Sequence, residues 1–243
     1  MTASIPNPAS PEQLAQIGHA AAQLIEPGQT VGLGSGRASH AFVRALAARL
    51  AREKFSILGI PTSNSTEKLA RELGIAIGSL ETISTIDIAV DGADEVTPAL
   101  DLLKGGGGDL LREKVVASIS RRFAIVVGHE KLVPCLGDKF PVFIEVVAFA
   151  LPVVVRCLQT LGGQAAPRLT PEGKLFLTDN SNPLLHAVFG PKPHHISNPE
   201  ALAAAISNIP GVVGHGMFLS MATDLFVAQP DGTIHYQQHP TKK

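Results

Sequence analysis

The sequence predicts an α/β fold with two parts, a Rossmann-like parallel-sheet main domain and a small ferredoxin-like α+β subdomain. Segments typical of strands alternate with segments typical of helices from the start of the chain to about Val127. Most of these strand segments are apolar throughout, which is typical of a parallel sheet whose two faces are both covered by helices. Beyond Pro134 the order changes to strand, helix, strand, strand, helix, strand, which is the order of a ferredoxin-like unit.

The elements of the main domain begin with a helix that opens at Ser10-Pro11-Glu12-Gln13. Ser10 can cap this helix, Pro11 suits its first position, and Gln13 can complete a capping box. Pro27-Gly28 ends the segment. The elements that follow are, in order, a strand at 30–33, a helix at about 38–52, a strand at 55–60, a helix at 65–73, a strand at 86–90, a helix at 110–118 and a strand at 123–127.

The second half of the chain contains the elements of the predicted subdomain. They are a strand at 142–149, a helix opened by Pro152, strands at 165–169 and 174–178, a helix opened by Asn198-Pro199, and extended residues at 212–213 and 217–219. The segment 225–228 is expected to return to the main sheet. We therefore expect a Rossmann-like catalytic domain at 1–134 and 211–243, and a subdomain at 135–210, for which 243 residues are enough.

The composition is that of a globular protein, with 45 % hydrophobic and 17 % charged residues. A net charge of −1 and scattered basic residues argue against a nucleic-acid or anionic-lipid partner. The most apolar run, 142–155, is too short for a membrane span and is interrupted by Glu145 and Pro152. Cys135 and Cys157 lie in no metal-ligand spacing, and the N-terminal residues carry no secretory signal. We expect a cytoplasmic protein that binds neither nucleic acid nor membrane.

A glycine-rich turn, Gly32–Gly36 (GLGSG), follows a predicted strand and opens a predicted helix. Its glycines let the backbone approach an anion, and the start of the helix presents free N–H groups. A dinucleotide fingerprint is excluded, because Arg37 stands where a glycine is required and no acid ends the next strand. The turn favours a phosphate monoester, to which Arg37 would add charge. A simple tight turn between strand and helix is the structural alternative.

Four acidic residues lie in or just after the predicted strand within 87–95 (DIAVDGADE). Two of them, Asp91 and Asp94, lie in one turn, where carboxylates in different surroundings can divide proton-transfer tasks. Turn formation or helix capping is the structural alternative. A metal site is a further alternative, but no histidine lies nearby and the spacing is not that of a calcium-binding loop.

The most specific segment is Lys104–Lys114 (KGGGGDLLREK). Four consecutive glycines in an ordered domain cost chain entropy, so some feature must require this bare backbone. A flexible linker is the alternative, but Leu102-Leu103 before the glycines and the helix after them argue against it. The N–H groups can bind a hydroxyl-rich substrate or an oxyanion, and Lys104 can stabilise negative charge. Glu113 can serve as a general base, although its spacing alone is that of a surface helix acid.

The run DGADE followed by KGGGG-D-LLREK resembles the signature of the A-type ribose-5-phosphate isomerase family, and the resemblance extends over almost the whole chain. Five other segments are similar to shorter motifs of that family: GLGSGRAS at 32–39, GIPTSNST at 59–66, GHEKLVPCL at 128–136, TDNSN at 178–182, and the stretch 211–218. The KGGGG…REK motif is highly specific, whereas each of the other five is modest alone.

This resemblance implies the reversible conversion of ribose 5-phosphate to ribulose 5-phosphate through an enediolate, in the non-oxidative pentose phosphate pathway. It implies no metal, no organic cofactor, and a homodimer or homotetramer. Matched residue by residue, Glu113 is the base that moves a proton between C2 and C1, and Lys104 is the cation near the enediolate. Asp91 and Asp94 match the acids for ring opening and hydroxyl proton transfer. The implied substrate-binding residues are Ser35, Gly36, Arg37, Ala38, Asp91, Gly92, Ala93, Asp94, Lys104, Gly105, Gly106, Gly107 and Lys131.

Two departures from the family pattern concern the residues that, by this resemblance, would bind the substrate phosphate. Arg37-Ala38 stands where the family has Ser-Thr, so two hydroxyls are lost and a guanidinium is gained. The first helix of the family often carries a lysine that reaches the phosphate, whereas Leu14 and its neighbours offer none. We hypothesise that Arg37 supplies the missing charge.

Two other functions compete with the isomerase. One is a related sugar-phosphate enzyme, such as an amino-sugar-phosphate deaminase, which does not share the KGGGG…REK run. The other is a non-catalytic sugar-phosphate sensor, which would carry a DNA-binding module. This sequence begins almost directly with the first predicted helix and keeps Glu113, and both features favour an enzyme.

Overall fold

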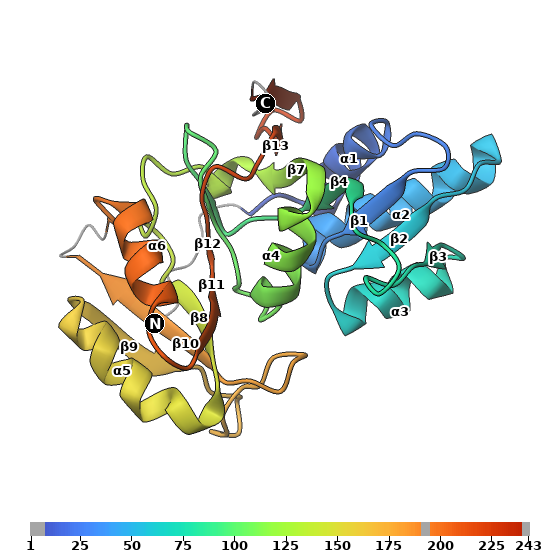
Figure 1. Ribbon diagram of the computed structural model, residues 1–243. Helices are drawn as coiled ribbons and strands as arrows, with labels where there is room; N and C mark the ends of the chain where they lie inside the picture. The colour runs from blue at the N-terminus through green and yellow to red at the C-terminus, as the bar shows by residue number, and fades with distance from the viewer. Residues whose placement is uncertain (1–7, 191–194, 240–243) are drawn as a thin grey trace. The chain divides into compact units, whose positions relative to one another are not determined.

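The computed structural model describes residues 8–190 and 195–239, and Figure 1 shows how the elements follow one another along the chain. The helices are α1 (Pro11–Ala22), α2 (Gly36–Glu53), α3 (Asn64–Glu72), α4 (Leu110–Ser118), α5 (Leu151–Thr160) and α6 (Pro199–Ser207), with short 3-10 helices η1 (His129–Lys131) and η2 (Ala148–Ala150). The strands are β1 (Thr30–Leu33), β2 (Leu58–Pro61), β3 (Ala76–Ile77), β4 (Ile86–Asp91), β5 (Glu95–Val96), β6 (Leu102–Leu103), β7 (Ser120–Gly128), β8 (Val142–Val146), β9 (Gly163–Pro167), β10 (Leu184–Phe189), β11 (Val212–His215), β12 (Met217–Phe218), β13 (Asp224–Ala228) and β14 (Ile234–Gln238).

Contacts divide these elements into two compact units. Among the described residues, the first unit contains 8–93, Arg112–Lys131 and 221–239. The second unit contains Asp94–Leu111 and Leu132–Ser220.

The first unit is built on a seven-stranded sheet in the order β14-β13-β7-β4-β1-β2-β3. All neighbours from β13 to β3 pair in parallel, and β14 pairs antiparallel with β13 at one edge. When the parallel strands are counted in chain order, the order across the sheet is 3-2-1-4-5-6, which is that of the Rossmann fold. The predicted main domain is therefore confirmed. The strand order reverses between β1 and β4, so the loops after these two strands lie at the edge where such folds bind ligands.

Helices cover both faces of this sheet, as the apolar strands predict. On one face, Leu14 of α1 and Phe42 of α2 belong to a buried cluster that includes Val31 of β1. On the other face, α4 packs closely, since a Cβ placed on Gly32 of β1 would lie 2.7 Å from Cγ1 of Val116. Gly32 therefore permits a close approach of helix and sheet.

Most element boundaries in the first unit lie within a few residues of those expected from the sequence. The capping box of α1 is present, because Ser10 Oγ accepts from Gln13 N–H and Gln13 Oε1 accepts from Ser10 N–H. The edge strands β3 and β14 were not anticipated. β3 has two residues, and β14 is largely exposed, so neither shows the apolar run that marks a buried strand.

The second unit contains a four-stranded antiparallel sheet in the order β11-β8-β10-β9. In chain order its elements are β8, α5, β9, β10, α6 and β11, which confirms the expected ferredoxin-like subdomain. Both helices pack on one face of the sheet (Figure 1), where Val154 of α5 and Ile206 of α6 share a buried cluster with Ile144 and Leu185.

The second of the two strands predicted between α5 and α6 does not lie at the expected residues. The predicted strand at 174–178 is part of the loop between β9 and β10 and forms isolated bridges at Leu175 and Leu177. Both leucines are exposed, so the apolar run at 175–177 does not mark a buried strand. The strand is β10, whose apolar run is interrupted by His186.

A third, small sheet, β12-β6-β5, also belongs to the second unit. Residues 94–111 and 211–220 therefore lie in that unit, whereas the expected boundaries assigned them to the main domain. The two segments are tied together, since Lys104 N–H donates to the carbonyl of Gly216 at 2.8 Å and Leu103 pairs with Met217. Leu103 and Met217 also join the buried cluster of the four-stranded sheet.

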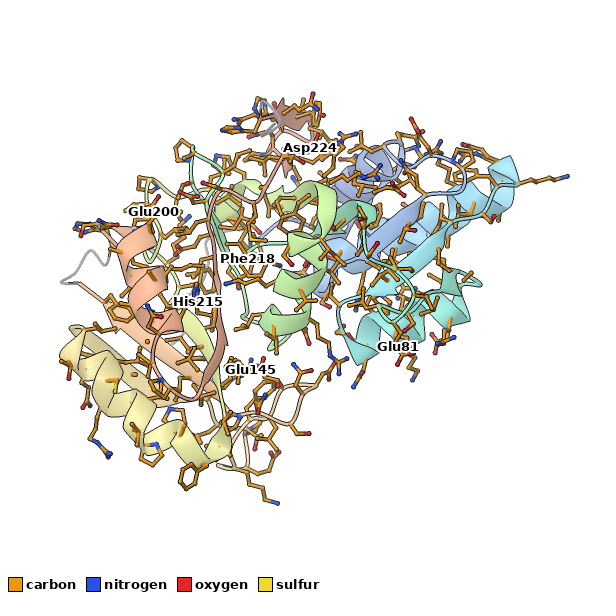
Figure 2. The ribbon with its side chains drawn as sticks, in the orientation of Figure 1. Glu81, Glu145, Glu200, His215, Phe218 and Asp224 are labelled. Atoms are coloured by element: carbon orange, nitrogen blue, oxygen red, sulfur yellow. The ribbon has the colours of Figure 1, made fainter. Side chains whose placement is uncertain are left out.

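Asp224 of β13 is a fully buried carboxylate (Figure 2). Its oxygens accept from the Arg122 guanidinium at 2.7 and 3.2 Å, and from the hydroxyls of Thr223 and Tyr236, each at 2.7 Å. Burial alone would raise the pKa of Asp224, but these hydrogen bonds and the charge of Arg122 outweigh it, so the pKa lies below its ordinary value. The carboxylate thereby joins β7, β13 and β14.

We expect Asp224→Asn to lower the free energy of unfolding by roughly 2–3 kcal/mol at pH 7, because Arg122 loses its charged partner. The pKa of Asp224 is lower in the folded than in the unfolded chain. The stabilisation is therefore complete above about pH 4 and is lost as the pH falls through the folded-state value. Urea unfolding of both proteins should show a difference that shrinks below about pH 4.

Glu67→Gln is the matched control, because it breaks an exposed pair with Arg71 at 2.8 Å. It should change stability by less than about 0.5 kcal/mol. If Asp224→Asn lost as much stability at pH 3 as at pH 7, an ionic role for Asp224 would be wrong.

Candidate active site

The loop after β1 lies at the point where the strand order of the first sheet reverses. Gly34 N–H donates to the carbonyl of Val90 in the neighbouring strand β4, at 2.9 Å. Gly36 has a φ of 85°, in the left-handed region, and α2 begins there. The chain therefore turns sharply from β1 into α2, and the first N–H groups of α2 lie at the ligand-binding edge of the sheet.

Asp91, the last residue of β4, is bonded to this loop. Its Oδ1 accepts from the N–H of Ser35 at 3.0 Å, the hydroxyl of Ser39 at 2.9 Å and the N–H of Gly92 at 2.8 Å. A Cβ on Gly34 would overlap with the Asp91 carboxylate, so this loop position requires glycine. Asp91 is only 2 % exposed. The sequence predicted both segments, and the structure brings them together.

A cluster of buried hydroxyl groups supports the same loop and was missed by sequence reasoning. Ser35 Oγ lies 2.8 Å from Thr62 Oγ1 and donates to Ser63 Oγ at 2.7 Å. Thr66 Oγ1 donates to the carbonyl of Gly34 at 3.0 Å. Thr62, Ser63 and Thr66 follow β2, in the segment GIPTSNST, which the sequence marked as a similarity without a role. The structure shows that this segment holds the loop after β1 in place.

Arg37 lies on the α1 side of the loop. Its Nη2 donates to the carbonyl of Ala9 at 3.4 Å, and its side chain lines an open groove of about 1010 Å³ together with His40 and Arg44. His40 Nε2 lies 3.1 Å from Thr66 Oγ1, and burial together with the charge of Arg44 lowers the pKa of His40. The hypothesis that Arg37 supplies charge to a phosphate stays a prediction.

Helix α4 carries Glu113 in its first turn. Glu113 is only 6 % exposed, so the surface helix acid that its spacing alone suggests is excluded. The next residue, Lys114, is half-buried, and burial lowers its pKa to about 8. Lys131 ends η1, directly after the parallel strand β7, and so follows the carboxyl end of that strand.

Asp94 belongs to the second unit and is bonded to the glycine tract, Gly105–Gly108. Its N–H donates to the carbonyl of Leu103 at 2.8 Å, and its Oδ2 accepts from the N–H of Gly106 at 2.8 Å. The N–H of Gly106 is therefore already engaged by a carboxylate. The Gly106 N–H is therefore not among the bare N–H groups of the tract that could bind a substrate.

The glycine tract forms an ordered turn, which excludes the linker alternative. Gly105 and Gly108 have φ angles of 112° and 103°, in the region that favours glycine, and Gly108 N–H donates to the carbonyl of Gly105 at 3.0 Å. A Cβ on Gly106 would lie 2.9 Å from Oδ1 of Asp94. The backbone conformation and this close carboxylate therefore account for three of the four glycines.

Lys104, directly before the tract, is 3 % exposed. Its Nζ lies 5.6 Å from the ring centroid of Phe218, within the range of a cation–π interaction. A buried ammonium group held in this way can stabilise negative charge more strongly than one in water.

Glu95 and Asp87, the other two acids of the segment 87–95, have structural roles. Glu95 is fully buried, and its carboxylate accepts from three N–H groups, those of Gly137 and Lys139 at 2.6 Å and that of Phe140 at 2.8 Å. Burial raises the pKa of Glu95, although these donors act in the opposite direction. Asp87 accepts from the N–H of Thr30 at 2.8 Å. Both acids therefore hold segments together that are distant in the sequence.

The predicted site residues divide between the two units. The first unit contributes Ser35–Ala38, Asp91–Ala93, Glu113 and Lys131; the second contributes Asp94 and Lys104–Gly107. Within residues 8–190 and 195–239, no three His, Cys, Asp or Glu side chains are grouped so that they could hold a metal ion. In the same residues, none of the helices combines the length and the apolar character needed to cross a bilayer.

Comparison with known proteins identifies the family. The model of the family described as ribose 5-phosphate isomerase A (phosphoriboisomerase A) matches residues 58–232. A ribose-5-phosphate isomerase A of Chloroflexus aurantiacus is 46 % identical over 217 residues, which cover 89 % of this chain and 89 % of the relative. One of Roseiflexus castenholzii is 44 % identical over 218 residues, which cover 89 % of this chain and 92 % of the relative.

Solved structures agree with this assignment. Ribose 5-phosphate isomerase A from Methanocaldococcus jannaschii has a TM-score of 0.89 and 34 % identity, covering 95 % of this chain and 100 % of its own. A D-ribose-5-phosphate isomerase in complex with phospho-erythronic acid has a TM-score of 0.88 and 34 % identity, covering 96 % of this chain and 100 % of its own. On these similarities, which extend over nearly its whole length, the chain belongs to the ribose 5-phosphate isomerase A family.

Proposed function

We propose that the protein interconverts D-ribose 5-phosphate and D-ribulose 5-phosphate through an enediolate, with Glu113 as the general base. The observation that carries the proposal is the burial of Glu113, 6 % exposed, in the first turn of the helix that follows the glycine tract. Exclusion of water protects a reactive enediolate from side reactions. Family membership favours this reaction over a deaminase or a sensor. The implied pathway is the non-oxidative pentose phosphate pathway, and a homodimer or homotetramer stays the expected assembly.

The reaction moves two protons and leaves the composition of the sugar unchanged. After the furanose ring opens, Glu113 takes the proton from C2, and the electron pair moves through C1 to O1 to give the enediolate. The same carboxylic acid then returns the proton to C1, while the hydroxyl proton of O2 passes to O1. Lys104 stabilises the negative charge of the enediolate. General acid–base catalysis of this kind contributes roughly 10²–10⁴-fold to the rate.

Asp91 and Asp94 serve ring opening and the proton transfers between hydroxyl groups. Their surroundings differ: Asp91 Oδ1 accepts three hydrogen bonds, including one from Ser35 N–H, whereas Asp94 Oδ2 accepts from Gly106 N–H. Two acids in unlike surroundings can take different protons in one reaction. The difference supports a division of tasks between them.

The substrate phosphate binds at the loop Ser35–Ala38, where the first N–H groups of α2 favour an anion. Arg37 and Lys131 add positive charge there. One solved relative binds phospho-erythronic acid, a phosphorylated sugar acid, and this supports a phosphorylated sugar as ligand for the present chain.

Glu113→Gln tests the base assignment, because the amide keeps the size of the side chain but cannot accept the C2 proton. We expect kcat for ribose 5-phosphate to fall by roughly 10²–10⁴-fold, while KM changes little. Ketose formation is measured with EDTA present, and full wild-type activity in EDTA is expected.

Glu200→Gln is the matched control, since Glu200 is also the acid in the first turn of a helix, but is exposed. It should keep the wild-type kcat. An inactive wild-type protein would defeat the proposed reaction, and a near-normal kcat for Glu113→Gln would show that another group is the base.

Arg37→Ala tests the phosphate assignment. We expect KM for ribose 5-phosphate to rise roughly tenfold with little change in kcat, which corresponds to one lost charge-assisted hydrogen bond. Arg44→Ala is the control, because Arg44 lines the same groove two turns further along α2. An unchanged KM for Arg37→Ala, or an equal rise for both variants, would refute a specific role for Arg37.

A further inference from the structure

Arg168, outside the proposed catalytic set, makes a hydrogen bond to the glycine tract. It follows β9, and its Nη1 donates to the carbonyl of Gly106 at 2.9 Å. The backbone of Arg168 is fixed by the four-stranded sheet, because its N–H donates to the carbonyl of Leu184 at 2.8 Å. A rigid part of the second unit therefore holds one defined carbonyl of the tract.

The hydrogen bond from Arg168 decides which way a neighbouring N–H points. The carbonyl of Gly106 and the N–H of Gly107 belong to one planar trans peptide unit, so they point in opposite directions. The preceding peptide unit, between Gly105 and Gly106, is held separately, by Asp94 at the Gly106 N–H and by Gly108 at the Gly105 carbonyl. Arg168 thus fixes the orientation of the unit that carries the Gly107 N–H.

This orientation needs fixing because glycines lack the side chain that restricts rotation of a peptide unit. If the unit between Gly106 and Gly107 flipped, a carbonyl oxygen would replace the N–H and would repel an anion. A donor aimed in advance at developing negative charge contributes to catalysis because it does not have to reorient during the reaction.

Phe176 supports Arg168 from the loop between β9 and β10. The guanidinium carbon of Arg168 lies 3.9 Å from the Phe176 ring centroid, and Phe176 N–H donates to the Arg168 carbonyl at 3.0 Å. The ring also touches the tract, since a Cβ on Gly108 would lie 2.7 Å from its Cε1. Arg168 and Phe176, both from the segment between β9 and β10, therefore contact the glycine tract.

We propose that Arg168 is a positioning residue for the isomerase reaction, which keeps the Gly107 N–H directed at the oxygen atoms of the substrate, with Phe176 holding the guanidinium in place. The inference rests on the proposed function. It predicts an effect on turnover more than on substrate affinity, because an oriented N–H matters most when charge develops on the substrate oxygens.

Arg168→Met tests the proposal, because it keeps the apolar stem and removes the donor. We expect kcat for ribose 5-phosphate to fall roughly 10–100-fold while KM changes far less. Arg168→Lys, which keeps a charged donor, should recover part of the lost kcat. Circular dichroism and the Tm establish that each variant is folded. Arg156→Met removes an exposed arginine of α5 in the same unit and should keep the wild-type kcat.

A folded Arg168→Met with wild-type kcat, a change confined to KM, or no recovery in Arg168→Lys would each overturn the inference. If Arg168→Met does not fold, Phe176→Leu provides the test: a folded protein with reduced kcat supports the positioning role, and one with wild-type kcat overturns it. An inactive wild-type protein would overturn the proposed function and this inference with it, whereas an active wild type with an active Arg168→Met overturns the inference alone.

Discussion

One carboxylate oxygen, Oδ1 of Asp91, holds the end of β4 to the start of α2. It accepts from a backbone N–H and a hydroxyl of the loop and helix, those of Ser35 and Ser39, and the geometry of the loop depends on this contact. Gly34 has no room for a side chain because the carboxylate lies against it. Ser35 can then turn its hydroxyl toward Thr62 and Ser63 instead of capping α2. The motifs GLGSG and DGADE are therefore two halves of one hydrogen-bonded arrangement.

In the second unit, side chains likewise fix the positions of the peptide groups of the glycine tract. Asp94 holds the N–H of Gly106, and Arg168 holds its carbonyl. A tract of glycines is useful to an enzyme only if such contacts remove the freedom that glycine brings. The rigid support comes from the ferredoxin-like sheet, because Arg168 is bonded to β10 through its backbone. If Arg168 positions the Gly107 N–H as we propose, the small unit takes part in the chemistry beyond its own stability.

Local patterns allowed much of the fold to be predicted. The capping box at Ser10, the alternation of apolar strands with helices, and the β-α-β-β-α-β order depend on neighbouring residues, and the structure confirms them. The failures involve contacts between distant segments. The apolar run at 175–177 is also typical of a strand, and only the pairing of β10 with β8 and β9 identifies the true strand. The burial of Glu113 is likewise invisible in helical spacing, because the groups that cover a side chain come from elsewhere in the chain.

Several buried charges among the described residues differ in what holds them. Glu95, Glu145 and Asp224 accept hydrogen bonds from donors that the fold fixes, and such carboxylates stabilise one conformation. Glu113 and Lys104 lie instead in the segment Lys104–Lys114, and we propose catalytic roles for both. In the proposed reaction, the C2 proton neutralises Glu113, and the negative charge appears on the enediolate instead. The net charge of the site therefore does not change. The proposed role of Lys104 is to stabilise this displaced charge, which a buried ammonium group can do with less solvent reorganisation than one in water.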